Sequence, residues 1–369
     1  MRRVPKRRRQ KTDMRRYRSS GFYSSYRGRS PLSTFLKVIA VFLAVVLLLS
    51  VAALFFLEPY WVYSADGGRL YLPWVQEPEE TDDQPLPTPS QPLVVITPEP
   101  VAEDPLHAVL LPRSALSDGT ARTLVDQAGG NAALFDMKAD DGTLAFVSAS
   151  PLAVSAGVNA AAGANETIAA LNAQDGLYTV ARLSCFRDNA LPRQRNDLAL
   201  RSSLGNWRDG DGIRWLSPAY QENRQYIADL CLELAGLGFD EILLDCAAFP
   251  LTGNLDGILT GTAYDPVGLT DVVLTFYTDT AAALKAAYPD VRLSVVADPS
   301  ILTTGGASAS GQTLDIVAPT DRLWVWGLTE GRDACEELLS QAGMEAPRTD
   351  LVSISAQAGA ADQSWALWA

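Results

Sequence analysis

An uncharged, apolar run of 20 residues, Val38–Leu57, constrains this chain more than any other feature of its sequence. At a rise of about 1.5 Å per residue, such a run forms a helix of about 30 Å, which matches the hydrocarbon core of a bilayer. The run is longer than the apolar region of a cleaved signal peptide, and Glu58-Pro59-Tyr60-Trp61 follows it in place of a small-residue cleavage site. The sequence therefore predicts a single transmembrane helix that acts as a signal anchor.

The charge changes sign across this run. Residues 1–37 contain 13 Lys and Arg and one acid, Asp13, so their net charge is +12, whereas the whole chain carries −13 and the remainder therefore −25. Positive residues stay on the cytoplasmic side of a membrane helix. We expect a cytoplasmic N-terminus, a disordered basic tail, and an extracytoplasmic remainder at the cell membrane. The tail could also bind anionic lipid or nucleic acid, but because it abuts the membrane helix we favour a topological role and expect no nucleic-acid partner.

Residues 58–105 have the composition of a spacer. They contain ten prolines and ten acids in 48 positions. Such a segment buries too little apolar surface to offset the entropy of folding, and its charges repel one another. We therefore expect an extended linker that holds residues 106–369 away from the bilayer.

Residues 106–369 have the length and the alternation of a (β/α)₈ TIM barrel. The segment is 264 residues long, and its short apolar runs alternate with helical patterns, as in parallel sheets with crossover helices. Apolar spacing predicts two long helices, over about 218–237 and 270–288. The strands are expected at eight places: 107–111, 132–137, 178–185, 241–245, 292–297, 314–318, 351–355 and 365–368.

Several kinds of chemistry are excluded by what the sequence lacks. The single histidine, His107, lies at the start of the first predicted strand, away from the catalytic end of a barrel. Serine or cysteine hydrolysis with a histidine base and multi-histidine zinc sites are therefore improbable, and no phosphate-binding glycine motif is present. We expect no cofactor and no metal. The four cysteines lack CxxC spacing, so buried free thiols are favoured over a disulfide or a metal site: Cys185, Cys231, Cys246 and Cys335.

Carboxylates at strand ends remain as candidates for catalysis. The carboxyl ends of barrel strands meet at one mouth, where active sites lie. The alternative for any one of these residues is that it caps the following helix. Asp245 stands out because it directly follows the apolar Ile242-Leu243-Leu244, where an ionisable group is costly unless it is paired or used. The five candidates end or follow strands two to six: Asp136, Asp188, Asp245, Asp298 and Asp321.

Four segments in order resemble a bacterial and archaeal family of predicted glycoside hydrolases whose barrel is related to that of the α-amylases. The resemblance implies hydrolysis of a glycosidic bond by two carboxyl groups. Asp245 would be the nucleophile or base, and Asp298, Asp188 or Asp136 the acid. The segments are Asp136-Met-Lys138-Ala-Asp140, Ala181-Arg182 with Phe186-Arg187-Asp188, Trp207-Arg-Asp209 with Trp215, and Phe239-Asp240-Glu241-Ile242 leading to Asp245.

Further mouth residues are expected to contact the substrate. Trp207 and Trp215 could stack on a sugar ring or anchor a loop, and Lys138 could instead pair with Asp136 or Asp140. The expected set is Lys138, Arg182, Trp207, Trp215 and Asp321.

The sequence also departs from the family pattern. Cys246 and Ala248 replace the expected Tyr and Arg, the family's strand-five acid would fall near Val296 while Asp298 lies two residues on, and Pro319-Thr320-Asp321 replaces a longer motif. Two functions therefore remain open. The retained acids favour a membrane-anchored hydrolase of cell-surface or environmental polysaccharide, and the missing residues favour an inactive barrel that binds cell-envelope glycan or a partner protein.

Overall fold

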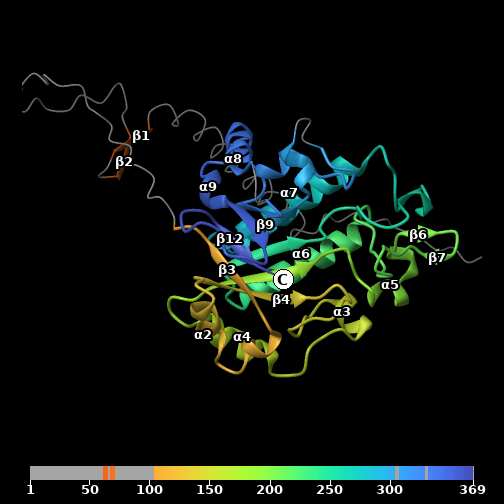
Figure 1. The fold of residues 1–369 in the computed structure, drawn as a ribbon, viewed down its shortest axis with the longest axis horizontal. Helices are drawn as coiled ribbons and strands as arrows, with labels where there is room; N and C mark the ends of the chain where they lie inside the picture. The colour runs from red at the N-terminus through yellow and green to blue at the C-terminus, as the bar shows by residue number, and fades with distance from the viewer. Residues whose placement is uncertain (1–60, 65–66, 71–103, 304–306, 329–330, 369) are drawn as a thin grey trace, which may run out of the picture. The chain divides into compact units, whose positions relative to one another are not determined.

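The computed structural model describes residues 61–64, 67–70, 104–303, 307–328 and 331–368 (Figure 1). The chain divides into two compact units, Met1–Val95 and Ile96–Ala369. Within the described residues, no helix combines the length and the apolar character that crossing a bilayer requires. The basic tail and the predicted membrane segment, Val38–Leu57, lie outside them.

The first unit contains a hairpin where the sequence predicts only an extended spacer. β1 (Trp61–Ser64) pairs with β2 (Gly67–Leu70) in an antiparallel ladder. The spacer over residues 58–105 stays a prediction, and this hairpin lies within it. Two aromatic residues and a valine in β1 favour a strand.

The second unit is a closed barrel of eight parallel strands, which confirms the predicted (β/α)₈ barrel. The strand order around the barrel is β10-β11-β12-β3-β4-β5-β8-β9, so the last strand pairs with the first. The strands are β3 (His107–Leu111), β4 (Ala132–Lys138), β5 (Tyr178–Ser184), β8 (Glu241–Asp245), β9 (Arg292–Ala297), β10 (Arg322–Trp326), β11 (Leu351–Ser355) and β12 (Trp365–Leu367).

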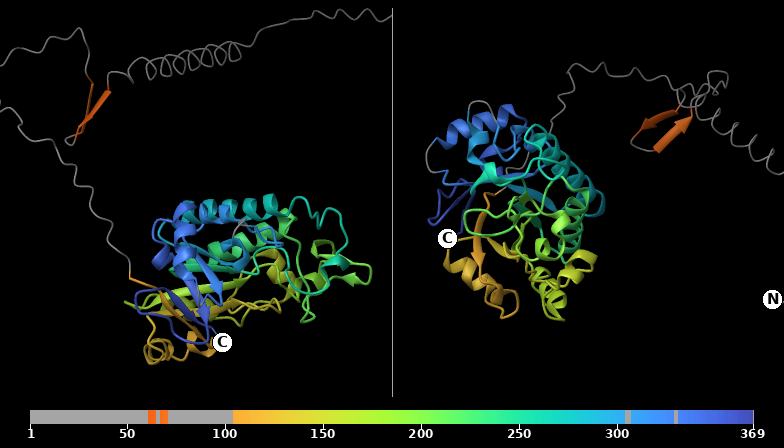
Figure 2. Two further views of the ribbon diagram at one scale, coloured as in Figure 1. Left: turned by 45° about the horizontal axis from the view of Figure 1, so that its top comes forward. Right: turned by 90° about the vertical axis from the view of Figure 1, so that its right-hand side faces the viewer.

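Helices surround this barrel (Figures 1 and 2). The two predicted long helices are α6 and α7, which pack against each other. The α-helices are α2 (Ala121–Gln127), α3 (Pro151–Ala156), α4 (Ala164–Asn172), α5 (Leu191–Gln194), α6 (Gln221–Gly236), α7 (Leu269–Ala287), α8 (Arg332–Gln341) and α9 (Pro347–Asp350). The 3₁₀ helices are η2 (Arg113–Leu116), η3 (Asn196–Leu198), η4 (Leu255–Gly257), η5 (Pro299–Leu302) and η6 (Leu314–Val317).

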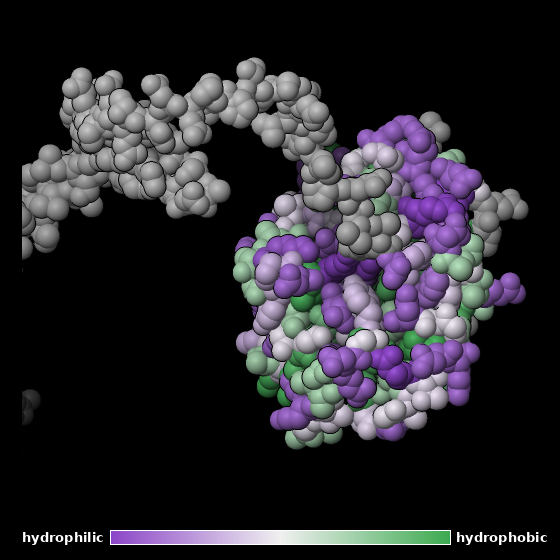
Figure 3. All heavy atoms as spheres, turned by 90° about the vertical axis from the view of Figure 1, so that its left-hand side faces the viewer, coloured by the Kyte–Doolittle hydropathy of each residue, from purple (hydrophilic) through white to green (hydrophobic). Residues whose placement is uncertain are grey.

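The connection from β5 to β8 is the longest excursion from the barrel. It carries α5 and a small hairpin of β6 (Arg201–Ser202) and β7 (Gly205–Asn206), which lie at one end of the barrel, on the right in Figure 1. Because it leaves the carboxyl end of β5, this excursion borders the mouth of the barrel. Figure 3 shows a different face of this unit, on which hydrophilic and hydrophobic residues are interspersed in small patches.

The sixth strand is not where the sequence predicts it. Residues 314–317 form η6, whose first turn is capped by Thr313, and the strand is β10. A short apolar run cannot be assigned by periodicity alone. Asp321 therefore precedes its strand and lies at the amino end of the barrel, where its Oδ2 accepts a hydrogen bond from Leu293 N (2.7 Å) and lies 3.2 Å from Lys285 Nζ. The prediction of Asp321 as a mouth residue is wrong.

The barrel interior has a polar floor beneath an apolar layer. Strand alternation points Leu243, Trp324 and Val352 inward, and they fill the middle of the barrel. Below them, Glu241 is completely buried. A buried carboxylate is tolerated only when its oxygens are satisfied.

Four groups satisfy the Glu241 carboxylate. Oε1 accepts from Ser294 Oγ (2.6 Å) and Trp324 Nε1 (3.1 Å), and Oε2 accepts from Arg322 Nη1 (2.6 Å) and Tyr178 OH (3.0 Å). Burial and the Glu241 charge raise the pKa of Tyr178, so its hydroxyl stays a donor. These bonds tie β5, β8, β9 and β10 together from within.

Removing the Glu241 charge should destabilise the barrel strongly. Glu241→Gln removes the carboxylate that lies 2.6 Å from Nη1 of the buried Arg322, while Asp350 stays 3.7 Å from its Nε; breaking a buried ion pair costs about 3–5 kcal/mol. The free energy of unfolding of the full-length chain, measured in urea, should fall by that amount. The matched control is Glu222→Gln, whose side chain is 47% exposed and whose partner Arg195 is 35% exposed, and it should cost less than about 1 kcal/mol. Equal losses in the two variants would contradict this account.

Candidate active site

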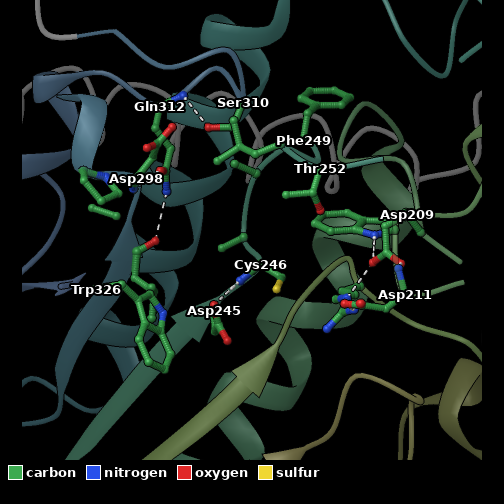
Figure 4. A pocket seen from close by; sticks show the side chains of 18 residues that line it. Asp209, Asp211, Asp245, Cys246, Phe249, Thr252, Asp298, Ser310, Gln312 and Trp326 are labelled. Carbon is green, nitrogen blue, oxygen red and sulfur yellow. Dashed lines mark hydrogen bonds and ion pairs between the residues drawn. The ribbon is translucent and has the colours of Figure 1, made fainter. Parts of the chain in front are cut away.

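A cavity of about 310 Å³ opens at the carboxyl ends of β8, β9 and β10 (Figure 4). Asp245 lies at its base, Asp298 and Trp326 on one side, and Asp209 and Asp211 on the other. The position agrees with the general rule that the active sites of such barrels lie at the carboxyl ends of the strands.

Asp245 is held in one orientation. It is the last residue of β8, and its side chain is 13% exposed. Its Oδ2 accepts from Nε (2.9 Å) and Nη2 (2.5 Å) of Arg182, and its Oδ1 accepts from Cys246 N (2.7 Å). Cys246 has φ of +46°, and it is the one non-glycine residue with positive φ in the described part of the chain. Backbone strain of this kind is a feature of functional sites, and here it accompanies the turn that follows Asp245.

Arg182 joins three carboxylates. Besides Asp245, its guanidinium donates to Asp136 (2.7 Å) and Asp140 (2.9 Å), and it lies 5.1 Å above the ring of Trp368. Burial alone would lower the pKa of Arg182, but the three negative charges raise it well above its ordinary value, so Arg182 remains a cation. Asp136 lines a neighbouring hollow of about 510 Å³ and does not line the Asp245 cavity.

Asp188 and Lys138 form a buried ion pair away from both hollows. Their charged atoms are 3.0 Å apart, and the two side chains are 1% and 0% exposed. The Asp188 Oδ1 accepts from Ala190 N and Leu191 N, so the carboxylate caps α5. A register shift between Asp136 and Lys138 aligns Lys138 with the outward-facing Leu183. This shift turns Lys138 into the layer between sheet and helices, and its ion-pair partner is Asp188 in place of Asp136 or Asp140.

Asp298 is the second predicted acid that reaches the Asp245 cavity. Its Oδ1 accepts from Ser300 N (3.0 Å), which caps η5, and its Oδ2 accepts from Ser308 Oγ. The register of β8 and β9 places Val296 beside Asp245, so Asp298 lies two residues, or about 7 Å of strand, nearer to solvent.

A loop of the β5–β8 excursion forms the opposite wall. The Asp209 Oδ2 accepts from Arg187 Nε (2.7 Å) and Trp215 Nε1 (3.0 Å). Arg187 also pairs with Asp140 and with Asp211, whose side chain is 79% exposed and lines the cavity. Sequence reasoning did not include Asp211 among the site residues. The Asp-Gly-Asp-Gly turn at 209–212 was the signal for it.

The two tryptophans that the sequence predicted as sugar contacts are buried, and a different tryptophan is exposed at the cavity. Trp207 and Trp215 are 3% and 6% exposed, and their indole N–H groups donate to Asn254 O (2.8 Å) and to Asp209. They anchor loops, which was the alternative to sugar stacking. Trp326, at the end of β10, is 44% exposed and lies 5.0 Å from the Trp368 ring. Sequence reasoning missed Trp326 because it placed the sixth strand too early.

Thiol and metal chemistry find no support in the described part of the chain. All four cysteines are free thiols, as predicted. Burial and the neighbouring Asp245 charge raise the pKa of Cys246, so its thiol stays protonated and is a poor nucleophile. Among the described residues, no group of three or more His, Cys, Asp and Glu side chains could hold a metal ion. His107 lies at the start of β3, as predicted, and stacks on Trp365 at 4.5 Å.

One family model matches more than half of this chain. A family described as "putative glycosyl hydrolase domain" matches residues 118–320, more than half of the chain. No curated protein matches. A hypothetical protein from Ruminiclostridium thermocellum is 25% identical over 52% of this chain and 96% of its own, with a TM-score of 0.41.

Two solved enzymes share less of their length with this chain. An α-galactosidase from Lactobacillus brevis is 14% identical over 68% of this chain and 33% of its own, with a TM-score of 0.44. An exo-β-N-acetylglucosaminidase from Vibrio harveyi is 14% identical over 69% and 41%, with a TM-score of 0.46. The chain therefore spans well under half of either enzyme.

The ionised carboxylate of Asp209 should stabilise the folded chain at neutral pH and lose that effect on acidification. Burial alone would raise the pKa of Asp209, but hydrogen bonds from Arg187, Trp215 and Ile213 lower it below 3.8. The stabilisation is therefore complete above about pH 3.8 and is lost as pH falls through the lowered value. Asp209→Asn should cost about 2 kcal/mol at pH 7.

The measurement is urea unfolding of the full-length chain between pH 7 and pH 2.5. The difference in the free energy of unfolding between the parent and Asp209→Asn should become smaller below pH 3.8. Asp126 is exposed on a helix, so Asp126→Asn should have the same free energy of unfolding as the parent throughout. A difference in the free energy of unfolding that grows on acidification would contradict the lowered pKa of Asp209.

Proposed function

This chain belongs to the family described as "putative glycosyl hydrolase domain", and from that membership we propose that its mouth cavity hydrolyses glycosidic bonds in polysaccharide or cell-wall glycan. One observation carries the proposal: Asp245 and Asp298, from neighbouring strands, line the same cavity. Hydrolysis of a glycosidic bond needs two carboxyl groups that flank the bond.

The roles follow from the surroundings of each group. Asp245 is the nucleophile or base, because Arg182 and Cys246 N fix its carboxylate at the base of the cavity. Asp298 lies nearer to solvent and is the acid that protonates the leaving group. Trp326 offers an exposed aromatic face at the rim, on which a sugar ring can stack.

An inactive, glycan-binding barrel is the second candidate. Val296 occupies the position beside Asp245, and both oxygens of Asp298 already accept hydrogen bonds, from Ser300 N and Ser308 Oγ. A carboxyl group engaged in this way is less free to deliver a proton. The cavity and Trp326 would then serve to bind a glycan or a partner protein without cleaving it.

We also propose that the protein is anchored in the cell membrane. The apolar run Val38–Leu57 anchors the chain in the cell membrane, with the basic residues 1–37 in the cytoplasm and the barrel outside. This arrangement restricts the substrate to polymers at or beyond the cell surface.

Loss of either cavity carboxylate should abolish turnover. The full-length protein is screened against neutral, amino and acidic polysaccharides and peptidoglycan, and the released reducing ends are measured. Asp245→Asn and Asp298→Asn should each lower kcat by at least about 10²-fold, since each removes a group that acts in the transition state. Asp279→Asn, exposed on α7, is the matched control and should leave kcat unchanged.

Binding measurements on the same variants distinguish the two candidates. If glycan binds without turnover and Asp245→Asn leaves the affinity unchanged, hydrolysis is excluded and the binding barrel remains. Activity that survives in Asp298→Asn but not in Asp245→Asn would assign the acid to another residue, with Asp211 the next in the cavity.

The orientation is tested on intact cells. Protease added from outside should cut the chain within residues 106–369 while leaving a cytoplasmic control protein whole. Permeabilised cells should then expose residues 1–37 to the same protease. If those residues are cut in intact cells, the orientation is inverted.

A further inference from the structure

A further hollow, of about 540 Å³, lies on the β6–β7 hairpin and shares no lining residue with the Asp245 cavity. It contains three arginines and no acidic residue. Its polar lining includes Arg201, Arg208, Arg214, Asn196, Asn206 and Asn254. A concentration of positive charge is unexpected here, because the chain beyond residue 37 carries a net charge of −25.

These arginines lack the carboxylate partners that other arginines of the barrel have. Arg201 donates to Asn206 Oδ1 (2.5 Å) and Arg214 to Asn189 Oδ1 (2.7 Å), and both acceptors are neutral amides. Within the described residues, none of the three forms an ion pair, whereas the nearby Arg195 pairs with two acids. In the described part of the chain, no carboxylate lies within ion-pair distance to compensate the charge of these three arginines.

Two of the arginines oppose each other directly. Arg208 and Arg214 are antiparallel bridge partners, which places their Cβ atoms about 5 Å apart on one face of the loop. Like charges in this arrangement destabilise the folded chain. Burial and the charges of Arg208 and Arg193 lower the pKa of Arg214, in agreement with this repulsion. A bound anion would relieve it.

The arginine hollow and the mouth cavity lie on opposite sides of one loop, which contains Arg208 and Asp209. Asp209 follows Arg208, and strand alternation directs Asp209 toward Arg187 and the Asp245 cavity while Arg208 lines the outer hollow. One loop therefore presents an acidic wall to the mouth and a basic wall to the outside. A long polymer could contact both walls.

We propose that the arginine hollow binds an acidic saccharide, whose carboxylate or phosphate lies between Arg208 and Arg214 and whose hydroxyls bond the asparagine amides. Arginine provides paired, charge-assisted donors for such anions, and the lining asparagines provide neutral donors and acceptors for hydroxyl groups. The inference does not rest on hydrolysis at Asp245, because binding at this hollow requires no turnover.

The test uses thermal unfolding of the full-length chain with tetragalacturonate, its methyl-esterified form, or inorganic phosphate. Residues 1–37 are basic and could also attract a polyanion, and the double variant described below, which leaves them unchanged, separates that contribution from binding at the hollow. A ligand that binds only the folded hollow should raise Tm by about 5 °C at 100 times its Kd. The ester, which has the same sugars without the charge, should bind at least about tenfold more weakly.

The variants identify the site. The double variant Arg208→Gln with Arg214→Gln should lose at least about half of the ligand-induced shift at the same ligand concentration, corresponding to at least about a tenfold increase in Kd, while its Tm without ligand stays equal to or above that of the parent. This combination separates a binding role from a structural one, since a structural arginine would lower Tm when replaced. The matched control is Arg195→Gln on the same excursion, which should keep the ligand-induced shift.

Three results would overturn the proposal. They are equal binding of the acid and its ester, an unchanged shift in the double variant, and a shift with phosphate as large as that with tetragalacturonate, which would assign the hollow to a free anion. Chromatography of the ligand after each scan reports any cleavage, so a failure of the proposed hydrolysis is seen separately.

Discussion

The carboxylate of Glu241 holds the barrel together from inside, and the position of the mouth depends on it. Its two oxygens accept hydrogen bonds from side chains of β5, β9 and β10, while the residue itself lies on β8. An ion pair in so dry a place is worth little compared with an apolar core, but an unpaired charge there is costly. The hydrogen bonds of Glu241 therefore hold four strands in position at the floor of the barrel, and the apolar layer that contains Trp324 packs above them.

Above that layer, the mouth is organised by two arginines that share acids. Asp140 accepts from both Arg182 and Arg187, so the wall at Asp209 is connected to Asp245 through a continuous chain of charged groups. Burial alone would raise the pKa of Asp140, but the two arginines keep it below its ordinary value. The network holds Asp245 rigidly, and rigidity of a charged group before the reaction is what electrostatic catalysis requires.

The excursion between β5 and β8 contributes lining residues to two separate hollows of the barrel. It supplies Asp211 and Trp215 to the mouth and the arginines to the outer hollow. Loops at the carboxyl ends of barrel strands vary in this way without disturbing the scaffold, so binding properties can differ between barrels of the same fold. The acidic wall of the mouth and the arginine hollow thus belong to one segment of chain but to opposite faces of it.

The amino-acid sequence by itself determined the barrel, seven of its eight strands, and the position of Asp245 at a strand end. These features are local: alternation, apolar runs and helix spacing are written in adjacent residues. It also placed His107 at the amino end of the first strand, where the structure has it.

Only the tertiary structure decided which side chains meet. A one-residue register shift sent Lys138 to Asp188, and a capped 3₁₀ turn moved the sixth strand, which put Asp321 at the amino end of the barrel and Trp326 at the rim. The facing of Arg208 and Arg214 arises from a pairing across a loop. Such contacts depend on register between segments far apart along the chain, and a shift of one residue reverses the face to which every side chain points.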